Sequence, residues 1–246
     1  MKRTVLLVIF VVATLWLFQG EGRAGTLQSC NGRPDLKELR IYFVNGINNT
    51  HEEARLSLAT LVGFVRDRVV KPANTCISIK LAENPTVSIY VDILETAAQR
   101  WQLSPQEVWL ALEGLGDPLP APVQEGLAAL VLGTLSEKIA ANNPLDQATI
   151  DRQVSLYKND YKSCRSILLV AHSQGNLYAR QAFNQSASGV DAIPAGALRV
   201  VSVATPDTVV PGGGPHATSS TDKIINLVRS LIGASDSNTN WEPDPP

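Results

Sequence analysis

Two patterns of apolar residues alternate along the chain. Four short, bulky apolar runs predict strands, because β-branched and aromatic side chains suit a buried pleated surface. Stretches with apolar residues on one side, at helical spacing, predict helices between them. Such alternation is typical of a mostly parallel sheet covered by helices on both faces, which is an α/β, doubly wound fold. The predicted strands are 39–45, 77–82, 167–170 and 199–204, with a further short extended piece at 87–93. The predicted helices beside them are 52–70 and 177–184.

A helical insertion is predicted over residues 94–162, before the strand 167–170. Its first helix begins at Ser104-Pro105-Gln106-Glu107, which combines an N-cap serine, a proline in the first turn and a capping-box glutamate. Two further helices are expected at 123–141 and 146–161. The insertion either forms a lid that presents an apolar face to a substrate or packs on the sheet, and ordinary packing is the favoured interpretation.

The first residues predict export. Lys2 and Arg3 precede an apolar run at 5–18 that is short for a membrane span, and Gly22-Arg23-Ala24 offers a small-x-small cleavage site. We therefore expect a signal peptide at 1–24, a single domain at 25–246, and a periplasmic or secreted protein without stable membrane insertion. An uncleaved anchor is the alternative.

Charge and cysteine content exclude several classes of function. The formal net charge is −2 and becomes about −4 without residues 1–24, which gives no electrostatic case for nucleic acid or an anionic membrane. No cysteine spacing or His/Cys cluster indicates a metal or other cofactor. Of the three cysteines, Cys30 and Cys76 are the favoured disulfide pair, with Cys164 free; three reduced thiols are the alternative.

Residues 166–178 carry the strongest chemical signal. The apolar strand ends in Ala171-His172-Ser173-Gln174-Gly175, and the chain then turns helical. A serine on a sharp strand-to-helix turn stands clear of the sheet edge, where its hydroxyl can attack. Ala171 and Gly175 are small, as the close approach of strand and helix requires. The N-terminus of the following helix points backbone N–H groups towards any developing oxyanion.

This stretch resembles the nucleophile elbow of the α/β-hydrolase superfamily, on its lipase and esterase side, with alanine in place of the first glycine. The resemblance implies that Ser173 is the nucleophile and that His172 braces the turn. It covers the layout of residues 36–232, although only the elbow, the Asn45-Gly46 loop and the strand end Ala204-Thr205-Pro206 are specific. The alternative is a buried strand with a chance serine and glycine.

The resemblance also implies an oxyanion hole. The first donor would be the backbone N–H of Gln174, which follows the nucleophile, and the second would come from the loop after the strand 39–45. Asn45-Gly46 stands where lipases often carry His-Gly, so the donor would be the backbone of Ile47, with Asn48 nearby. Gly46 would let the backbone approach a reacting carbonyl. A plain Asn-Gly turn is the alternative.

Two aspartates compete for the acid, which follows the serine in this fold. Asp207 comes after a strand end that resembles the lipase Thr-Pro motif. Asp222 ends a Thr/Ser-rich strand, as the acid does in fungal-type lipases, and is the favoured choice. The alternatives are a turn residue for Asp207 and a helix N-terminal carboxylate for Asp222.

The base is less well defined, since the chain has three histidines. His172 adjoins the serine, and His51 precedes it in chain order, so His216 is the candidate. The order Ser173, Asp207, His216 is the expected one. No histidine follows Asp222, and many relatives carry theirs in a later segment. A triad built on Asp222 would therefore be incomplete in this chain.

These residues predict an exported, monomeric serine hydrolase that cleaves a carboxylic ester through an acyl-enzyme, without a cofactor. The acidic chain and the helical insertion favour an uncharged small-molecule or lipid ester as substrate. The alternative is a catalytically impaired or C-terminally truncated hydrolase fold that acts as an exported binding protein.

Overall fold

The computed structural model describes residues 37–46, 51–69, 74–84, 146–207 and 209–219, with isolated residues at 102, 104, 120, 123, 126, 222, 225, 226 and 229. The strands are β1 (Lys37–Val44), β2 (Thr75–Leu81), β3 (Ser166–His172), β4 (Leu198–Val203) and β5 (His216–Ala217). The helices are α2 (His51–Arg68), α6 (Gln147–Lys162) and α7 (Gly175–Ser186), with a short 3-10 turn, η1 (Pro211–Gly213).

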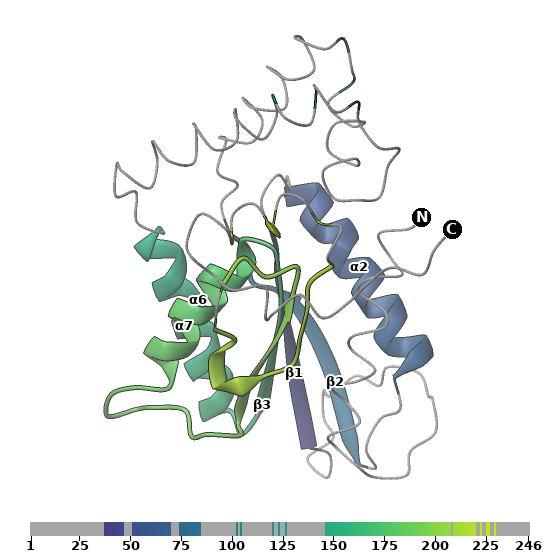
Figure 1. The fold of residues 1–246 in the computed structure, drawn as a ribbon. Coiled ribbons are helices and arrows are strands. Elements are labelled where there is room, and N and C mark those ends of the chain that lie inside the picture. The colour runs from purple at the N-terminus through teal and green to yellow at the C-terminus, as the bar shows by residue number, and fades with distance from the viewer. Residues whose placement is uncertain are drawn as a thin grey trace.

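The five strands form one parallel sheet in the order β2-β1-β3-β4-β5 (Figure 1). Strand β3 is therefore central, with β1 on one side and β4 on the other. Within the described residues, the predicted α/β class and the four predicted strands are confirmed. Because all strands run the same way, the residues that follow β1, β2, β3 and β4 meet at one edge of the sheet.

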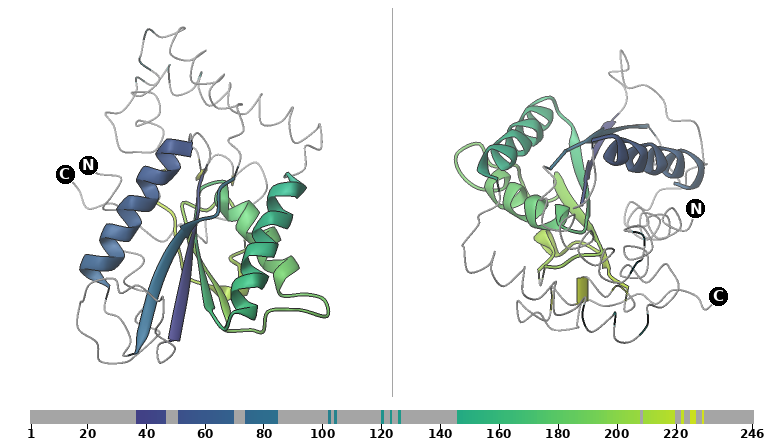
Figure 2. Two further views of the ribbon diagram at one scale, coloured as in Figure 1. Left: turned by 180° about the vertical axis from the view of Figure 1, so that it is seen from behind. Right: turned by 90° about the horizontal axis from the view of Figure 1, so that it is seen from above.

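Helices cover both faces of the sheet (Figures 1 and 2). Alternate strand residues contribute to two apolar cores, as the period of two in a strand requires. One core packs β1, β3 and β4 against α6 and α7, and the other packs β1, β2 and β3 against α2. Central strand β3 is buried from Ile167 to Ala171, which explains why its sequence is continuously apolar.

Helix α6 lies within the predicted insertion and packs on the sheet. Asp146 caps its N-terminus by accepting a hydrogen bond from the Thr149 N–H (3.1 Å), as the sequence pattern predicts for a helix at 146–161. Ile150 and Tyr157 are buried in the core. For this part of the insertion, the structure favours ordinary packing; the other expected insertion helices lie largely outside the described residues, as does the predicted strand piece at 87–93.

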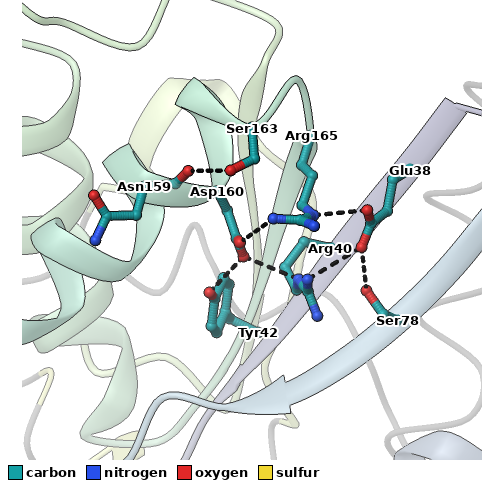
Figure 3. Close-up of polar contacts among 8 residues, drawn as sticks. All are labelled: Glu38, Arg40, Tyr42, Ser78, Asn159, Asp160, Ser163 and Arg165. Atoms are coloured by element: carbon teal, nitrogen blue, oxygen red, sulfur yellow. Dashed lines mark hydrogen bonds and ion pairs between the residues drawn. The ribbon is translucent and has the colours of Figure 1, made fainter. Parts of the chain in front are cut away.

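A buried charge cluster ties α6 to the amino end of β1 (Figure 3). The Asp160 carboxylate accepts a hydrogen bond from the Tyr42 hydroxyl (2.6 Å) and faces Arg40 (2.9 Å) and Arg165 (3.0 Å). Glu38 faces the same two arginines at 3.1 and 2.7 Å. Two carboxylates thus face two guanidinium groups, which is the arrangement that makes buried charges tolerable.

Several predictions concern other parts of the chain. The signal peptide at 1–24 lies outside the described residues; within them, no helix combines the length and apolar character needed to cross a bilayer. Cys76 is disulfide-bonded and Cys164 is an exposed free thiol. Cys30, the remaining cysteine of the sequence, lies outside the described part of the chain.

Candidate functional site

Ser173 occupies a sharp turn between β3 and α7. Its backbone φ is 53°, a left-handed conformation that few residues other than glycine adopt. Such strain persists only where neighbours hold it in place. The Ser173 N–H donates to the Val203 carbonyl (3.0 Å), and the Asn176 side-chain amide donates to the carbonyls of Ser173 (2.8 Å) and Val203 (3.0 Å). Asn176 therefore fastens the turn to the end of β4, a role that the sequence does not reveal.

Two glycines allow the turn to approach β1 closely. A methyl group added to Gly175 would lie 2.3 Å from the Val44 carbonyl oxygen. One added to Gly46 would lie 2.8 Å from Ser173 Cβ and 3.0 Å from His172 Nδ1. The structure therefore brings the predicted Asn45-Gly46 turn directly against the predicted nucleophile, and alanine fits at neither glycine.

The Gln174 N–H is suitably placed for an oxyanion. Gln174 immediately precedes α7, where the first N–H groups of a helix have no partner within the helix. In the part of the chain that the structure describes, neither this N–H nor the Ser173 hydroxyl has a hydrogen-bond partner. Ile47 and Asn48, the expected source of the second donor, lie outside the described residues.

Three buried amides lie beside Gly46, and two of them were not predicted from the sequence. Asn45, Asn84 and Gln153 are each at most 2 % exposed. The side chains of Asn45 and Asn84 each bond to the backbone of the other, and Gln153 donates to Asn84 Oδ1 (2.8 Å). Gln153 lies on the same buried face of α6 as Ile150 and Tyr157. A polar residue at helical spacing among apolar ones could have indicated from the sequence that its side chain is buried and hydrogen-bonded.

Asp207 follows β4 and is engaged with a cation. Arg180, on α7, donates to Asp207 Oδ1 (2.7 Å), and the Asp207 side chain is 4 % exposed. The Thr205 hydroxyl accepts a hydrogen bond from the Asp207 N–H (3.1 Å). The carboxylate thus has a structural partner at the sheet edge.

Asp222, the favoured acid in the sequence, lies at a helical turn. Its carboxylate accepts a hydrogen bond from the Ile225 N–H (2.9 Å), and its carbonyl accepts one from Asn226 N–H (3.0 Å). Asp222 is therefore a carboxylate at the N-terminus of a helical turn, which is the alternative role predicted for it from the sequence. Of the predicted Thr/Ser-rich strand, which begins at Ala217, Ala217 is the one described residue that lies in a strand, β5.

His216 is half-buried in β5 and pairs in register with Ser202, which pairs with Ala171. Among the described residues, no hydrogen bond joins His216 to Ser173. Burial, and secondarily the positive charge of Arg229, lowers the pKa of His216 below its usual value of 6.5. That environment disfavours the imidazolium that a catalytic base must form.

His51, the first residue of α2, has a carboxylate partner. Its Nδ1 lies 2.9 Å from Glu83 Oε2, across 32 residues of chain. His51 begins α2 and Glu83 follows the end of β2, so both residues lie at the carboxyl edge of the sheet. A carboxylate on Nδ1 favours the tautomer that leaves Nε2 to accept a proton, but both side chains are exposed, His51 to 64 % and Glu83 to 40 %, so solvent weakens this preference. Glu83 gave no signal in the sequence, because its partner is distant along the chain.

The geometry thus joins the elbow, the Gln174 N–H and the Asn45-Gly46 turn. Within the described residues, no hydrogen bond joins Ser173 to Asp207, Asp222 or His216. Among the described residues, no group of three or more His, Cys, Asp or Glu side chains is arranged to hold a metal ion. Comparisons of the chain with protein-family models, curated proteins and solved structures find no match.

Proposed function

We propose that the protein is a serine hydrolase of the α/β-hydrolase type that cleaves carboxylic esters. The observation that carries the proposal is the left-handed backbone of Ser173, at the carboxyl end of the central strand and against Gly46. A non-glycine residue in this conformation, held by Asn176 and Val203, costs folding free energy of roughly 1–3 kcal/mol. Its retention beside an unpaired helix N-terminal N–H fits a nucleophile better than a structural turn.

In the proposed reaction, Ser173 Oγ attacks the ester carbonyl carbon while a histidine accepts the hydroxyl proton. The carbonyl oxygen becomes an oxyanion stabilised by the Gln174 N–H and by the peptide that follows Gly46. Collapse of the tetrahedral intermediate expels the alcohol, which takes the proton from the histidine, and leaves an acyl-serine. Water, deprotonated by the same histidine, then hydrolyses this acyl-enzyme.

A fluorophosphonate probe tests the nucleophile. We expect the wild-type protein to be labelled once and to hydrolyse p-nitrophenyl butyrate, and Ser173→Ala to lose both. Ser188→Ala is the matched control, because Ser188 is an exposed serine beyond α7 whose hydroxyl bonds only locally to Gln185. Absence of Ser173-dependent labelling together with absence of turnover would refute the enzyme and favour an exported binding protein.

The base is tested separately, because two histidines compete for it. His216 has the expected chain order, whereas His51 has the carboxylate partner; triad geometry occurs in several chain orders. The variant that removes the base should lower kcat by roughly 10²- to 10⁴-fold, and the other variant should leave it nearly unchanged. His216→Ala and His51→Ala, measured over pH 6–9, assign the role. Full activity in both variants would exclude both residues.

A further inference from the structure

We propose that Gln153 and Asn84 are positioning residues that hold the Asn45-Gly46 turn in place against Ser173. The inference rests on the proposed function and extends it to α6, a helix that contributes no group to the reaction itself. It is carried by the buried hydrogen-bond chain from Gln153 to the Asn45-Gly46 turn.

The first link is a reciprocal clasp between two asparagines. Asn84 donates from its side-chain amide to the Asn45 carbonyl, and its backbone N–H donates to Asn45 Oδ1 (2.8 Å). Asn45 in turn donates from Nδ2 to the Asn84 carbonyl (3.4 Å) and to the Gly46 carbonyl (3.2 Å). The carbonyl oxygens of Asn45 and Gly46 are therefore both held by side-chain amides.

The second link fixes which way these amides face. Because Asn84 Nδ2 donates to a backbone carbonyl, Asn84 Oδ1 must face Gln153. An acceptor in that position requires a donor, and Gln153 supplies Nε2 at 2.8 Å, with a longer contact to the Ala82 carbonyl (3.4 Å). A turned Gln153 would place two oxygens against each other in a site that excludes water. A donor at position 153 thus determines which atoms donate and which accept in every hydrogen bond from Gln153 to the Asn45-Gly46 turn.

The third link reaches the reacting centre. The Gly46 carbonyl is held by Asn45 Nδ2 (3.2 Å), and Gly46 itself lies against Ser173. In the proposed reaction this turn would help to stabilise the oxyanion, and a stabilising group works only when it is aimed in advance at the position of the developing charge. Loss of the clasp would therefore weaken transition-state binding without removing a substrate contact.

Gln153→Met tests this mechanism, since methionine keeps the length of the side chain and removes the donor. We expect kcat to fall roughly 10- to 100-fold with little change in KM, because a positioning defect acts on the transition state. Gln153→Glu retains the shape, but its carboxyl can donate to Asn84 Oδ1 only when protonated, so kcat of this variant should fall relative to wild type as the pH rises and the carboxyl ionises. Gln147→Met is the matched control: it removes an exposed amide of the same helix, which donates to Asp151 (2.7 Å), and should match wild type.

A second variant separates positioning from general damage to the fold. In Asn84→Ala the series of hydrogen bonds between Gln153 and Asn45 is already interrupted. Adding Gln153→Met to that variant should therefore lower kcat by less than a further twofold. Rates are normalised to the fraction of protein that binds the fluorophosphonate at Ser173. If wild type lacks Ser173-dependent labelling, the proposed function fails. If wild type is labelled and Gln153→Met keeps kcat within twofold, or the two changes multiply independently, only this inference fails.

Discussion

Replacement of Gly175 by alanine tests the closest approach in the candidate site. The added methyl group would lie 2.3 Å from the Val44 carbonyl oxygen and 2.6 Å from that of Asn45. Ordinary contact begins near 3.4 Å, so α7 and the end of β1 must separate by about 1 Å. Both obstacles are backbone atoms in buried residues, and no flexible side chain can move aside to relieve the overlap.

The stability change follows from this overlap. Overpacking of this kind destabilises by about 1–3 kcal/mol. Gly63→Ala is the matched control, because Gly63 lies inside α2 and its added methyl group would meet nothing within 4 Å. Alanine there should stabilise the helix by about 0.5–1 kcal/mol. The free energies of unfolding of the two variants should therefore differ by about 1.5–4 kcal/mol. For a protein of this size, each kcal/mol corresponds to a shift of roughly 2–4 °C in Tm.

The same displacement would affect the proposed reaction. A 1 Å shift of the elbow away from the Asn45-Gly46 turn would separate the nucleophile from the oxyanion loop, and misplacements of that size cost about 10²-fold in rate. Thermal unfolding and the rate of fluorophosphonate labelling, measured on both variants and wild type, check the two expectations. A Gly175→Ala protein with the Tm and labelling rate of Gly63→Ala would refute the close approach.

Three further predictions concern stability. Asp160→Asn should lower the free energy of unfolding, measured in urea, by about 3 kcal/mol, because it removes one of two carboxylates that face the buried Arg40 and the partly exposed Arg165; Asp191→Asn, at an exposed ion pair, should cost less than about 1 kcal/mol. Asp222→Ala should cost about 1 kcal/mol through loss of the N-terminal cap, whereas Asp222→Asn, which keeps a cap acceptor, should cost little; an equal loss in both variants would contradict the capping role. Burial and Arg229 lower the pKa of His216, so the unfolded chain binds the proton first as pH falls below about 6.5 and stability decreases. The urea concentration at the unfolding midpoint, measured from pH 8 to pH 5, should therefore fall less in His216→Gln than in wild type. An identical pH dependence in the two proteins would show that His216 does not cause the loss of stability.

Local chemistry explains which elements the sequence predicts well. Strands β1, β3 and β4 are buried on both faces, so their apolar residues form continuous runs. The elbow is predictable because a serine, two small neighbours and a strand-to-helix change fall within one short segment. Strand β5 has only two residues, and its pairing with β4 depends on the loop that contains η1. No sequence period can reveal an element of that length.

The polar part of the site was less predictable, because its contacts join distant segments. His51 meets Glu83, and Asn84 meets Gln153 across 69 residues. Such pairs depend on strand order and on the register of α6 against the sheet, neither of which is written in local composition. Asp222 shows the opposite difficulty: an aspartate before an apolar stretch suits both an acid strand and a helix cap, and only its bond to the Ile225 N–H distinguishes them.

The contacts around Glu83 and Asn84 also bear on how this chain tolerates change in length. Arg152 donates to the Glu83 carbonyl (2.9 Å), and Gln153 bonds Asn84, so the points where the chain leaves β2 and enters α6 are fastened to each other. The exit from β2 is thus held against the second turn of α6, although 69 residues of sequence separate Asn84 from Gln153. Closure entropy changes by only about 0.6 kcal/mol for each doubling of length between two such points. A change in the number of residues between Asn84 and Asp146 would therefore alter the closure cost of this junction very little.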